Sequence, residues 1–260
     1  MTKVWLHGYH GRMGQEILHL LEEDSHLKFL GGSSRNQLIL PGREPNGYSP
    51  NDLVESLGET DVIIDFSNIA GNQAIFKACK THKLEPKAFV IGTTGLDRGA
   101  RNAWKDLCRE AGHRLLFAPN TSLGVLLTMK MSQQMAQVLS PMGFDIEIIE
   151  SHHRNKVDSP SGTAMFLADR ICDKVDLKVS THRTGKREAN ELGVFALRGG
   201  SVFGEHEVRF MGDHEELAIS HRALSRTLFA KGALLLAKWI QKQKPGQHYG
   251  LPDVDLNDLA

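Results

Sequence analysis

Two adjacent histidines and a lysine lie close together in the segment 150–164. Imidazole is the side chain that ordinarily titrates near neutral pH, so His152 or His153 is a candidate to donate or accept a proton in a reaction. Lys156 adds a positive charge beside them. These residue types predict proton transfer next to an anionic substrate. Two alternatives compete with this interpretation: a surface loop, and a metal site, which the absence of an HExxH motif disfavours.

The same segment continues into Pro160-Ser161-Gly162-Thr163-Ala164, a pattern typical of a helix start. The first backbone amides of a helix have no partner inside the helix, and the helix dipole makes their surroundings favourable to anions. We therefore expect the amides of Gly162 and Thr163 to be unpaired and to hold a carboxylate. No metal is expected here, because the other histidines are scattered along the chain.

A second candidate site lies at the N-terminus, where Gly8, Gly11 and Gly14 separate a strand-like run from a helix-like run. A strand, a glycine-rich turn and a helix start together form the phosphate site of dinucleotide-binding folds. The spacing is GxxGxxG, and His10 occupies the place where a middle glycine is commoner. The turn predicts a dinucleotide site; the alternative is an ordinary tight turn between a strand and a helix.

The end of the next strand indicates which dinucleotide is preferred. An acidic residue there holds the ribose 2′-hydroxyl of NAD, whereas an arginine accepts a 2′-phosphate. The chain has Ser33-Ser34-Arg35 at this point and no carboxylate. We therefore expect NADPH to be preferred, with NADH possible; the alternative is a solvated loop.

Three further strand ends carry small or polar residues: 65–67, 92–94 and 118–122. Ligands of open α/β sheets bind beyond the carboxyl ends of the strands, which predicts that these segments line one site. Asn120 and Ser122 are equally typical of helix capping, so that alternative stays open.

These sites require an α/β protein with a parallel sheet in its first half. Short apolar strands alternate with helices up to about residue 117, and their continuous apolar character is typical of parallel strands buried on both faces. We expect residues 36–60 to form a loop rich in Asn, Pro, Gly and Ser. After Pro119 the pattern changes to that of a second, mixed α/β domain. Its expected elements are helices over 122–140 and 224–241 and strands at 144–150, 194–197, 202–203, 207–211 and 217–219.

Composition excludes several classes of protein. The 31 Lys and Arg balance the 31 Asp and Glu among 260 residues, which argues against nucleic acid and anionic membranes as partners. No apolar run approaches the roughly 18 residues of a membrane span, and the N-terminal apolar run is too short for a signal peptide. Three distant cysteines fit a reducing compartment, so we expect a cytoplasmic protein.

At these residues the sequence resembles the dihydrodipicolinate (4-hydroxy-tetrahydrodipicolinate) reductase family of lysine biosynthesis. The most specific match is Glu150-x-His152-His153-x-x-Lys156-x-Asp158-x-Pro160-Ser161-Gly162-Thr163-Ala164. Further matches are Gly8-x-x-Gly11-Arg12-Met13-Gly14, Asp65-Phe66-Ser67, Gly92-Thr93-Thr94-Gly95, Arg198-Gly199-Gly200, Gly204-Glu205-His206, Ser225-Arg226 and Phe229-Ala230-x-Gly232-Ala233. They span about residues 4 to 240.

The resemblance implies a Rossmann-like cofactor domain over 1–122 with a returning segment over 231–260, and a substrate-binding and tetramerisation domain over 123–230. It implies a homotetramer that transfers hydride from NAD(P)H to C4 of a cyclic dicarboxylate and then protonates the ring. His152 would be the proton donor or acceptor, Lys156 a second proton donor or an electrostatic anchor, and His153 with the Gly162 and Thr163 amides would hold a carboxylate. The residues that would line the cofactor are Gly8, Tyr9, His10, Gly11, Arg12, Met13, Ser34, Arg35, Phe66, Gly92, Thr93, Thr94, Pro119, Asn120, Thr121 and Ser122.

The sequence departs from the family pattern at four positions. Ser34 stands where members that use both cofactors often have an acid, and Thr121 where Phe is common. Ser159 replaces a usual Ala, and His10 replaces a small residue of the phosphate loop. Two other functions stay open: a nicotinamide oxidoreductase acting on another small acid, and a non-catalytic NADPH sensor that would not need His152, Lys156 and the Gly162 amide together.

Overall fold

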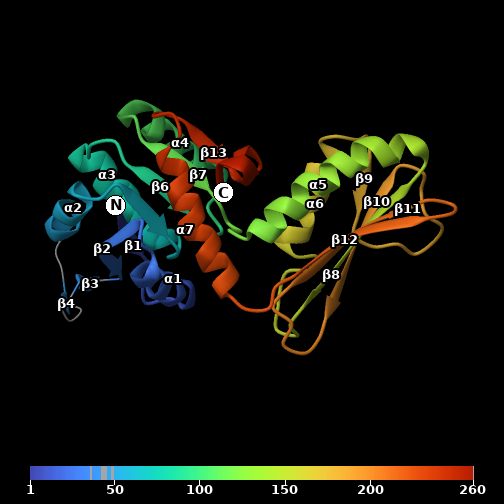
Figure 1. Ribbon diagram of the computed structural model, residues 1–260, viewed down its shortest axis with the longest axis horizontal. Helices are drawn as coiled ribbons and strands as arrows, with labels where there is room; N and C mark the ends of the chain where they lie inside the picture. The colour runs from blue at the N-terminus through green and yellow to red at the C-terminus, as the bar shows by residue number, and fades with distance from the viewer. Residues whose placement is uncertain (36, 42–45, 48–49, 260) are drawn as a thin grey trace. The chain divides into compact units, whose positions relative to one another are not determined.

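The computed structural model describes residues 1–35, 37–41, 46–47 and 50–259. The chain divides into two compact units, shown in Figure 1. Unit 1 contains Met1–Ser122 and Thr227–Ala260, and unit 2 contains Leu123–Arg226. The chain therefore leaves the first unit once and returns to it, so that its C-terminal part completes the unit that its N-terminal part began.

Unit 1 is built on a sheet with the strand order β13-β7-β6-β5-β1-β2-β3-β4. Its strands are β1 Thr2–His7, β2 Leu27–Ser34, β3 Gln37–Ile39, β4 Asn46–Gly47, β5 Val62–Asp65, β6 Ala88–Ile91, β7 Arg114–Phe117 and β13 His248–Gly250. The strands from β13 to β2 pair in parallel, and β3 and β4 add an antiparallel edge. This arrangement confirms the predicted α/β fold with a parallel sheet.

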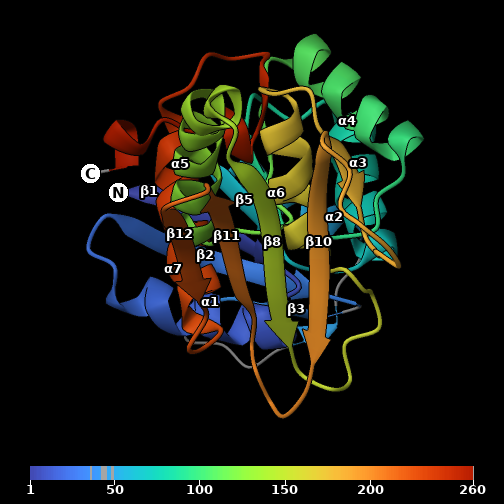
Figure 2. The ribbon, with the colours of Figure 1, turned by 90° about the vertical axis from the view of Figure 1, so that its right-hand side faces the viewer.

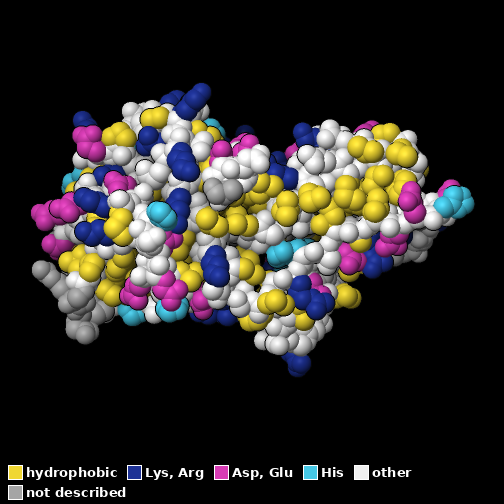
Figure 3. All heavy atoms as spheres, in the orientation of Figure 1, with side chains coloured by type: hydrophobic (Ala, Val, Ile, Leu, Met, Phe, Trp, Pro, Cys, Tyr) yellow, Lys and Arg dark blue, Asp and Glu magenta, His cyan; other side chains and the backbone are white. Residues whose placement is uncertain are grey.

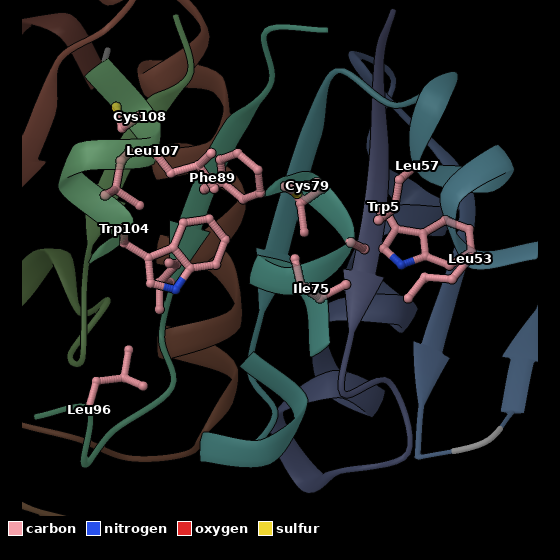
Figure 4. Close-up of a cluster of buried hydrophobic side chains, with 14 of the residues drawn as sticks. Trp5, Leu53, Leu57, Ile75, Cys79, Phe89, Leu96, Trp104, Leu107 and Cys108 are labelled. Atoms are coloured by element: carbon pink, nitrogen blue, oxygen red, sulfur yellow. The ribbon is translucent and has the colours of Figure 1, made fainter. Parts of the chain in front are cut away.

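Helices cover this sheet on both sides, as the parallel pattern requires. They are α1 Arg12–Glu23, α2 Pro50–Gly58, α3 Ile69–His82, α4 Arg98–Ala111 and α7 Thr227–Gln241. Figure 4 shows the core between the sheet and α2, α3 and α4, in which Trp5, Phe89 and Trp104 are the largest side chains. Because β5 and β6 are buried at every position, their side chains pack against helices on both faces.

Unit 2 contains a mixed sheet with the strand order β12-β11-β8-β10-β9. Its elements are α5 Leu123–Leu139, a 3₁₀ turn Ser140–Met142, β8 Asp145–His152, α6 Gly162–Cys172, β9 Lys178–Ser180, β10 Glu191–Arg198, β11 Glu205–Met211 and β12 Glu216–Arg222. Figure 2 shows β12, β11, β8 and β10 side by side. β8 pairs in parallel with β10 and antiparallel with β11. In β8 the buried Ile146 and Ile148 point to the face covered by α5 and α6.

Several element predictions were wrong. The expected loop 36–60 contains β3, β4 and α2, and α2 forms because Leu53 and Leu57, one turn apart, pack into the core beside Trp5. The expected strand 202–203 is part of the connection from β10 to β11, where the carbonyl of Val202 accepts a hydrogen bond from the amide of His153. The last long helix begins at Thr227 rather than at 224. In the part of the chain that the structure describes, no helix is long and apolar enough to cross a membrane.

Candidate functional site

A cleft of about 640 Å³ lies in unit 1 beyond the carboxyl ends of β1, β2 and β5. β1 lies between β2 and β5, so the strand order reverses at this point of the sheet, which is where open α/β sheets bind ligands. The cleft is lined by His7, Gly8, His10, Gly11, Ser34, Arg35, Gln37, Phe66, Ser67, Asn68, Ala70, Gly71 and Ala74. Six of the predicted cofactor residues (Gly8, His10, Gly11, Ser34, Arg35 and Phe66) are among them.

The glycine turn between β1 and α1 is tightly packed. Gly8 has a φ of +89°, and a Cβ added to it would lie 2.5 Å from the carbonyl oxygen of Phe66. A Cβ on Gly14 would lie 2.3 Å from the carbonyl oxygen of Gly8. Gly11 is the N-cap of α1 and has no side chain to satisfy the first amides of the helix. The turn thus brings a helix N-terminus, with its partial positive charge, to the cleft, which fits a phosphate group.

The other end of the cleft carries the residues predicted to select the cofactor. Ser34 is the last residue of β2, and Arg35 follows it with a φ of +51°. None of the described residues that line the cleft is acidic, and Ser34 and Arg35 offer a hydroxyl and a guanidinium there. The donor set therefore fits a dinucleotide that carries an extra phosphate.

The wall of the cleft is held by a buried carboxylate at the end of β5. Asp65 accepts hydrogen bonds from the amide and the hydroxyl of Ser67, at 2.9 and 2.5 Å, and from the side-chain amide of Asn72 at 2.7 Å. Gly92 lets the ring of Phe66 lie directly on its backbone, since an added Cβ would be 2.5 Å from that ring. Asp65 and Gly92 thus fix the positions of lining residues.

Other predicted cofactor residues have structural partners. Thr121 is buried and its hydroxyl donates to the carbonyl of Phe229 at 2.7 Å. The amide of Ser122 donates to the side chain of Asn120 at 2.9 Å, in the turn that precedes α5. Tyr9 is buried, and Thr93 lies 3.5 Å from the hydroxyl of Ser67. Contacts of these residues with a cofactor stay predictions, as do those of Arg12, Met13, Thr94 and Pro119.

The second predicted site lies at the end of β8 in unit 2. His152 is the last residue of this strand, and its side chain is only 10% exposed. Its Nδ1 lies 2.6 Å from Oε2 of Glu150. His152 is therefore a buried residue with a fixed hydrogen-bond partner and not part of a surface loop.

Glu150 is fully buried and receives several donors. Arg198 donates to both of its carboxylate oxygens, at 2.9 and 2.7 Å, and the amide of Ser161 donates at 2.9 Å. Burial alone would raise the pKa of Glu150, but the hydrogen bonds from Arg198, His152 and Ser161 outweigh it and lower the pKa. Glu150 is therefore a carboxylate at neutral pH, and the Nδ1–H of His152 donates to it.

His206 on β11 packs against His152. The two rings meet edge to face with centroids 5.2 Å apart, and Nε2 of His206 lies 3.2 Å from the hydroxyl of Ser161. Burial lowers the pKa of His206 to about 4, with a further contribution from His152. His206 is therefore neutral at pH 7 and adds no charge to the site.

The predicted anion site at the start of α6 is already paired with a carboxylate of the chain. Ser161 is the N-cap, as predicted, and its hydroxyl accepts from the amide of Ala164. The expectation that the Gly162 amide is unpaired was wrong, because it donates to Asp158 at 3.2 Å. The other oxygen of Asp158 lies 2.8 Å from Nζ of Lys156. A carboxylate is thus held by two donors that were predicted to hold a substrate.

Comparisons with known proteins agree with this geometry. The family model for dihydrodipicolinate reductase, N-terminus, matches residues 2–121, and the model for dihydrodipicolinate reductase, C-terminus, matches residues 124–254. The chain belongs to the dihydrodipicolinate reductase family. Family membership confirms the resemblance and makes the chain an oxidoreductase of a pyridine-nucleotide-dependent family.

Relatives of this reductase family are similar over nearly their whole length. The 4-hydroxy-tetrahydrodipicolinate reductase of Aquifex aeolicus (strain VF5) is 40% identical, covering 94% of this chain and 96% of the relative. The enzyme of the same name from Myxococcus xanthus (strain DK1622) is 37% identical, covering 95% and 96%. The solved structure of a dipicolinate-bound dihydrodipicolinate reductase from Paenisporosarcina sp. TG-14 has a TM-score of 0.77 at 22% identity, covering 98% of this chain and all of that one, and so shares the fold.

Three residues of this reductase that contact His152 or its partners were not assigned a role from the sequence: Glu150, Arg198 and His206. Glu150 and His152 are two residues apart on one strand, so strand geometry alone places them on one face. Arg198 and His206 lie on the neighbouring strands β10 and β11, and both fall in motifs that carried the resemblance. Their contacts depend on the register of strand pairing, which the residue pattern of a single strand does not determine.

Proposed function

We propose that this reductase converts 4-hydroxy-tetrahydrodipicolinate, or the dihydrodipicolinate formed from it by loss of water, to tetrahydrodipicolinate in the lysine and diaminopimelate pathway. NADPH is the preferred reductant, and NADH is used less well. The observation that carries the proposal is the carboxylate of Asp158 between Lys156 and the Gly162 amide, next to the paired imidazole of His152. Reduction of a cyclic dicarboxylate requires donors that hold a carboxylate and, beside them, a group that supplies a proton.

The cofactor binds in the cleft of unit 1. The turn Gly8–Gly11 and the N-terminus of α1 hold the pyrophosphate, and Phe66 lines the facing wall of the cleft. Ser34 and Arg35 bind the 2′-phosphate, for which a guanidinium supplies two parallel donors. When bound, the dihydronicotinamide supplies a hydride to C4 of the substrate ring.

The substrate is held by one of its carboxylates at the start of α6. The pair of donors that holds Asp158 supports this role, since the same two donors, Lys156 Nζ and the Gly162 amide, match a substrate carboxylate. The substrate carboxylate replaces that of Asp158, with His153 and the Thr163 amide as further contacts. The side chain of Asp158 is 56% exposed, so it has room to turn toward solvent.

His152 supplies the proton that completes the reduction. Its Nδ1 is bonded to Glu150, so Nε2 is the nitrogen that gives up a proton. Lys156, whose side chain is 22% exposed, keeps a positive charge beside the ring and stabilises negative charge that develops after hydride addition. Once water has left the 4-hydroxy compound, one hydride and one proton are added to a ring double bond of dihydrodipicolinate, which balances the reduction.

We further propose that the enzyme works in the cytoplasm as a homotetramer. The cysteines at 79, 108 and 172 are all unpaired, which suits a reducing compartment. On the sheet of unit 2, Leu197 points away from α5 and α6 and is 60% exposed. Leu197 shares this face with Ile149 and Phe195, and an apolar patch of this kind supports contact with a second copy of the chain.

The proposal is tested by measuring the loss of nicotinamide absorbance when the enzyme receives substrate freshly generated by the synthase that makes it. We expect fast oxidation of NADPH and slower oxidation of NADH at matched concentrations. Arg35→Ala should raise the KM for NADPH about 10- to 100-fold and leave that for NADH nearly unchanged, because a charge-assisted bond to the phosphate is lost. Equal rates with both cofactors would contradict the preference. Binding of NADPH without oxidation would contradict the reaction and favour a sensor.

A further inference from the structure

Unit 2 contains a buried glutamate with several hydrogen-bond donors that the proposed chemistry does not use directly. The carboxylate of Glu150 is fully buried and accepts hydrogen bonds from Arg198, from the Ser161 amide and from His152. Two of these donors come from strand β10 and from the N-cap of α6, so the carboxylate cannot turn without breaking bonds to both elements. Its position relative to the imidazole is therefore fixed before any ligand binds.

This arrangement determines which nitrogen of His152 reacts. An ionised carboxylate only accepts hydrogen bonds, so Nδ1 must carry a proton whether the imidazole is neutral or charged. Nε2 is then the only atom of the ring that gains and loses a proton. On that side the backbone of Gly204 leaves space, because an added Cβ would lie 2.9 Å from Nε2.

We infer that Glu150, held by Arg198 and the Ser161 amide, is a positioning residue that fixes the tautomer of His152 and stabilises its protonated form. The inference rests on the proposed proton transfer by His152. Serine proteases hold their histidine in the same chemical way with a buried aspartate, although on unrelated folds. Here the carboxylate comes from the same strand as the histidine, two residues before it.

The charges that face His152 act in opposite directions. Burial lowers its pKa the most, the bond and the charge of Glu150 raise it, and the positive charges of Lys156 and Arg198 lower it. His206 faces the ring but is neutral, and Asp158 offsets part of the charge of Lys156. Glu150 is thus the main group in contact with the ring that favours its protonated form, and its removal should lower the proton affinity of His152.

The variant Glu150→Gln tests this role, because glutamine keeps the size and one acceptor but removes the charge. We expect the pKa of His152 to fall by about one unit or more, and kcat near neutral pH to fall at least about tenfold. The Kd values for NADPH and dipicolinate should change less than about threefold, since Glu150 contacts neither under the proposal. An unchanged histidine pKa together with unchanged kcat would overturn the inference.

Glu147→Gln is the matched control. Glu147 is a buried carboxylate on the same strand, ion-paired with Arg183 at 2.6 Å, but it points to the opposite face of the sheet. Loss of this charge should leave the pKa of His152 and kcat near their wild-type values. If Glu147→Gln lowered the pKa of His152 and kcat as much as Glu150→Gln does, any buried charge on β8 would have the same effect, and the inference would be overturned.

A measurement on the wild-type protein keeps the inference testable if Glu150→Gln does not fold. Nitrogen-15 NMR of labelled histidines, with His152 assigned from the His152→Gln variant, shows which ring nitrogen titrates. We expect Nδ1 to keep the shift of a protonated nitrogen at every pH and Nε2 to titrate. Titration at Nδ1 would overturn the inference. The NMR result does not depend on turnover, so it separates this failure from a failure of the proposed reaction, which would show as no NADPH oxidation by the wild type.

Discussion

His152 and Lys156 both carry protons, but their surroundings suit them to different tasks. His152 is buried against Glu150 and His206, where one nitrogen is fixed and the other can exchange a proton. Lys156 lies nearer to solvent and pairs with the carboxylate of Asp158. The first arrangement suits proton transfer and the second suits recognition of an anion.

The two roles predict different kinetic effects. His152→Gln should lower kcat about 10²–10⁴-fold, the range that general acid catalysis contributes, with little change in the Kd of dipicolinate. Lys156→Ala should lower kcat and also weaken dipicolinate binding, because the donor that holds a carboxylate is lost. Both variants should bind NADPH normally, which isothermal titration calorimetry can check.

Asn155→Ala is the control for these two substitutions, since Asn155 is exposed in the same loop. It should leave both kcat and the dipicolinate affinity within about twofold of wild type. Near-normal turnover in His152→Gln and Lys156→Ala would mean that the proton comes from another group.

The sequence could predict which residues lie at the candidate site, but not all of their partners. His152, Lys156 and Ser161 could be singled out because they fall within one short segment whose residue types are informative on their own. The bond between Asp158 and the Gly162 amide could not be assigned, because an acidic residue before a helix start can equally face solvent. The bond from the Thr121 hydroxyl to the carbonyl of Phe229 could not be assigned either, because Phe229 lies more than a hundred residues away in the chain.

At the scale of elements, the phosphate turn combines a local signal with a tertiary constraint. The three glycines could be recognised in the sequence, yet the reason that Gly8 must be a glycine is the carbonyl of Phe66, which follows a neighbouring strand. The segment 36–60 shows the opposite case. Its composition favours a loop, and the helical spacing of Leu53 and Leu57 is too short a signal to predict a helix by itself. The helix forms because these leucines pack into the core beside the sheet.

The turn yields a prediction about stability. Gly8→Ala should lower the free energy of unfolding by about 1–3 kcal/mol, because alanine is strained at a φ of +89° and its Cβ would meet the Phe66 carbonyl. NADPH binding should also weaken, since the turn must shift. Urea unfolding and calorimetry measure the two effects.

Gly58→Ala provides the comparison for this change. Gly58 ends α2, and an added Cβ there would meet no atom within 4 Å. This variant should be as stable as wild type or slightly more stable, because alanine favours helix. Equal losses in both variants would contradict the packing argument for Gly8.

At the scale of the whole molecule, buried histidines make stability depend on pH. Burial lowers the pKa of His113 in unit 1 and of His206 in unit 2 to about 4, whereas an unfolded histidine titrates near 6.5. Between these values the unfolded chain binds more protons than the folded one. The free energy of unfolding should therefore be constant above about pH 6.5 and fall as the pH drops toward 4, by up to about 1.4 kcal/mol per pH unit for each histidine.

Urea unfolding between pH 4.5 and 7.5 measures this slope. His113→Asn should flatten it, because asparagine keeps an acceptor for the Lys87 amide without a group that titrates in this range. His82→Asn, at an exposed position on α3, should leave the slope unchanged. A free energy of unfolding that increases toward low pH would contradict the effect expected of these histidines.

The sheet of unit 2 predicts how copies of the chain assemble. Side chains alternate along β10, so Leu192 and Val194 are buried toward the helices, whereas Phe195 and Leu197 point to the far face. That face also carries Ile149 of β8 and the guanidinium of Arg183 over Phe195. It offers both apolar area and arginine, the composition that protein interfaces favour.

A second apolar surface competes for the same role. Figure 3 shows apolar side chains gathered along α5, where Leu127, Met131 and Val138 are exposed. Leu197 and Val138 are exposed to nearly the same extent, 60% and 61%, so one glutamate substitution at each position compares the two surfaces at similar exposure. A charge placed in an interface loses its water and lacks a partner, which disfavours assembly.

We expect wild type to have the mass of a tetramer by light scattering and native mass spectrometry, and Leu197→Glu to shift it to smaller species at micromolar concentration. Val138→Glu should remain tetrameric. The opposite pattern would assign the contact to α5 and leave the sheet face to another function. A wild-type monomer would contradict the tetramer itself.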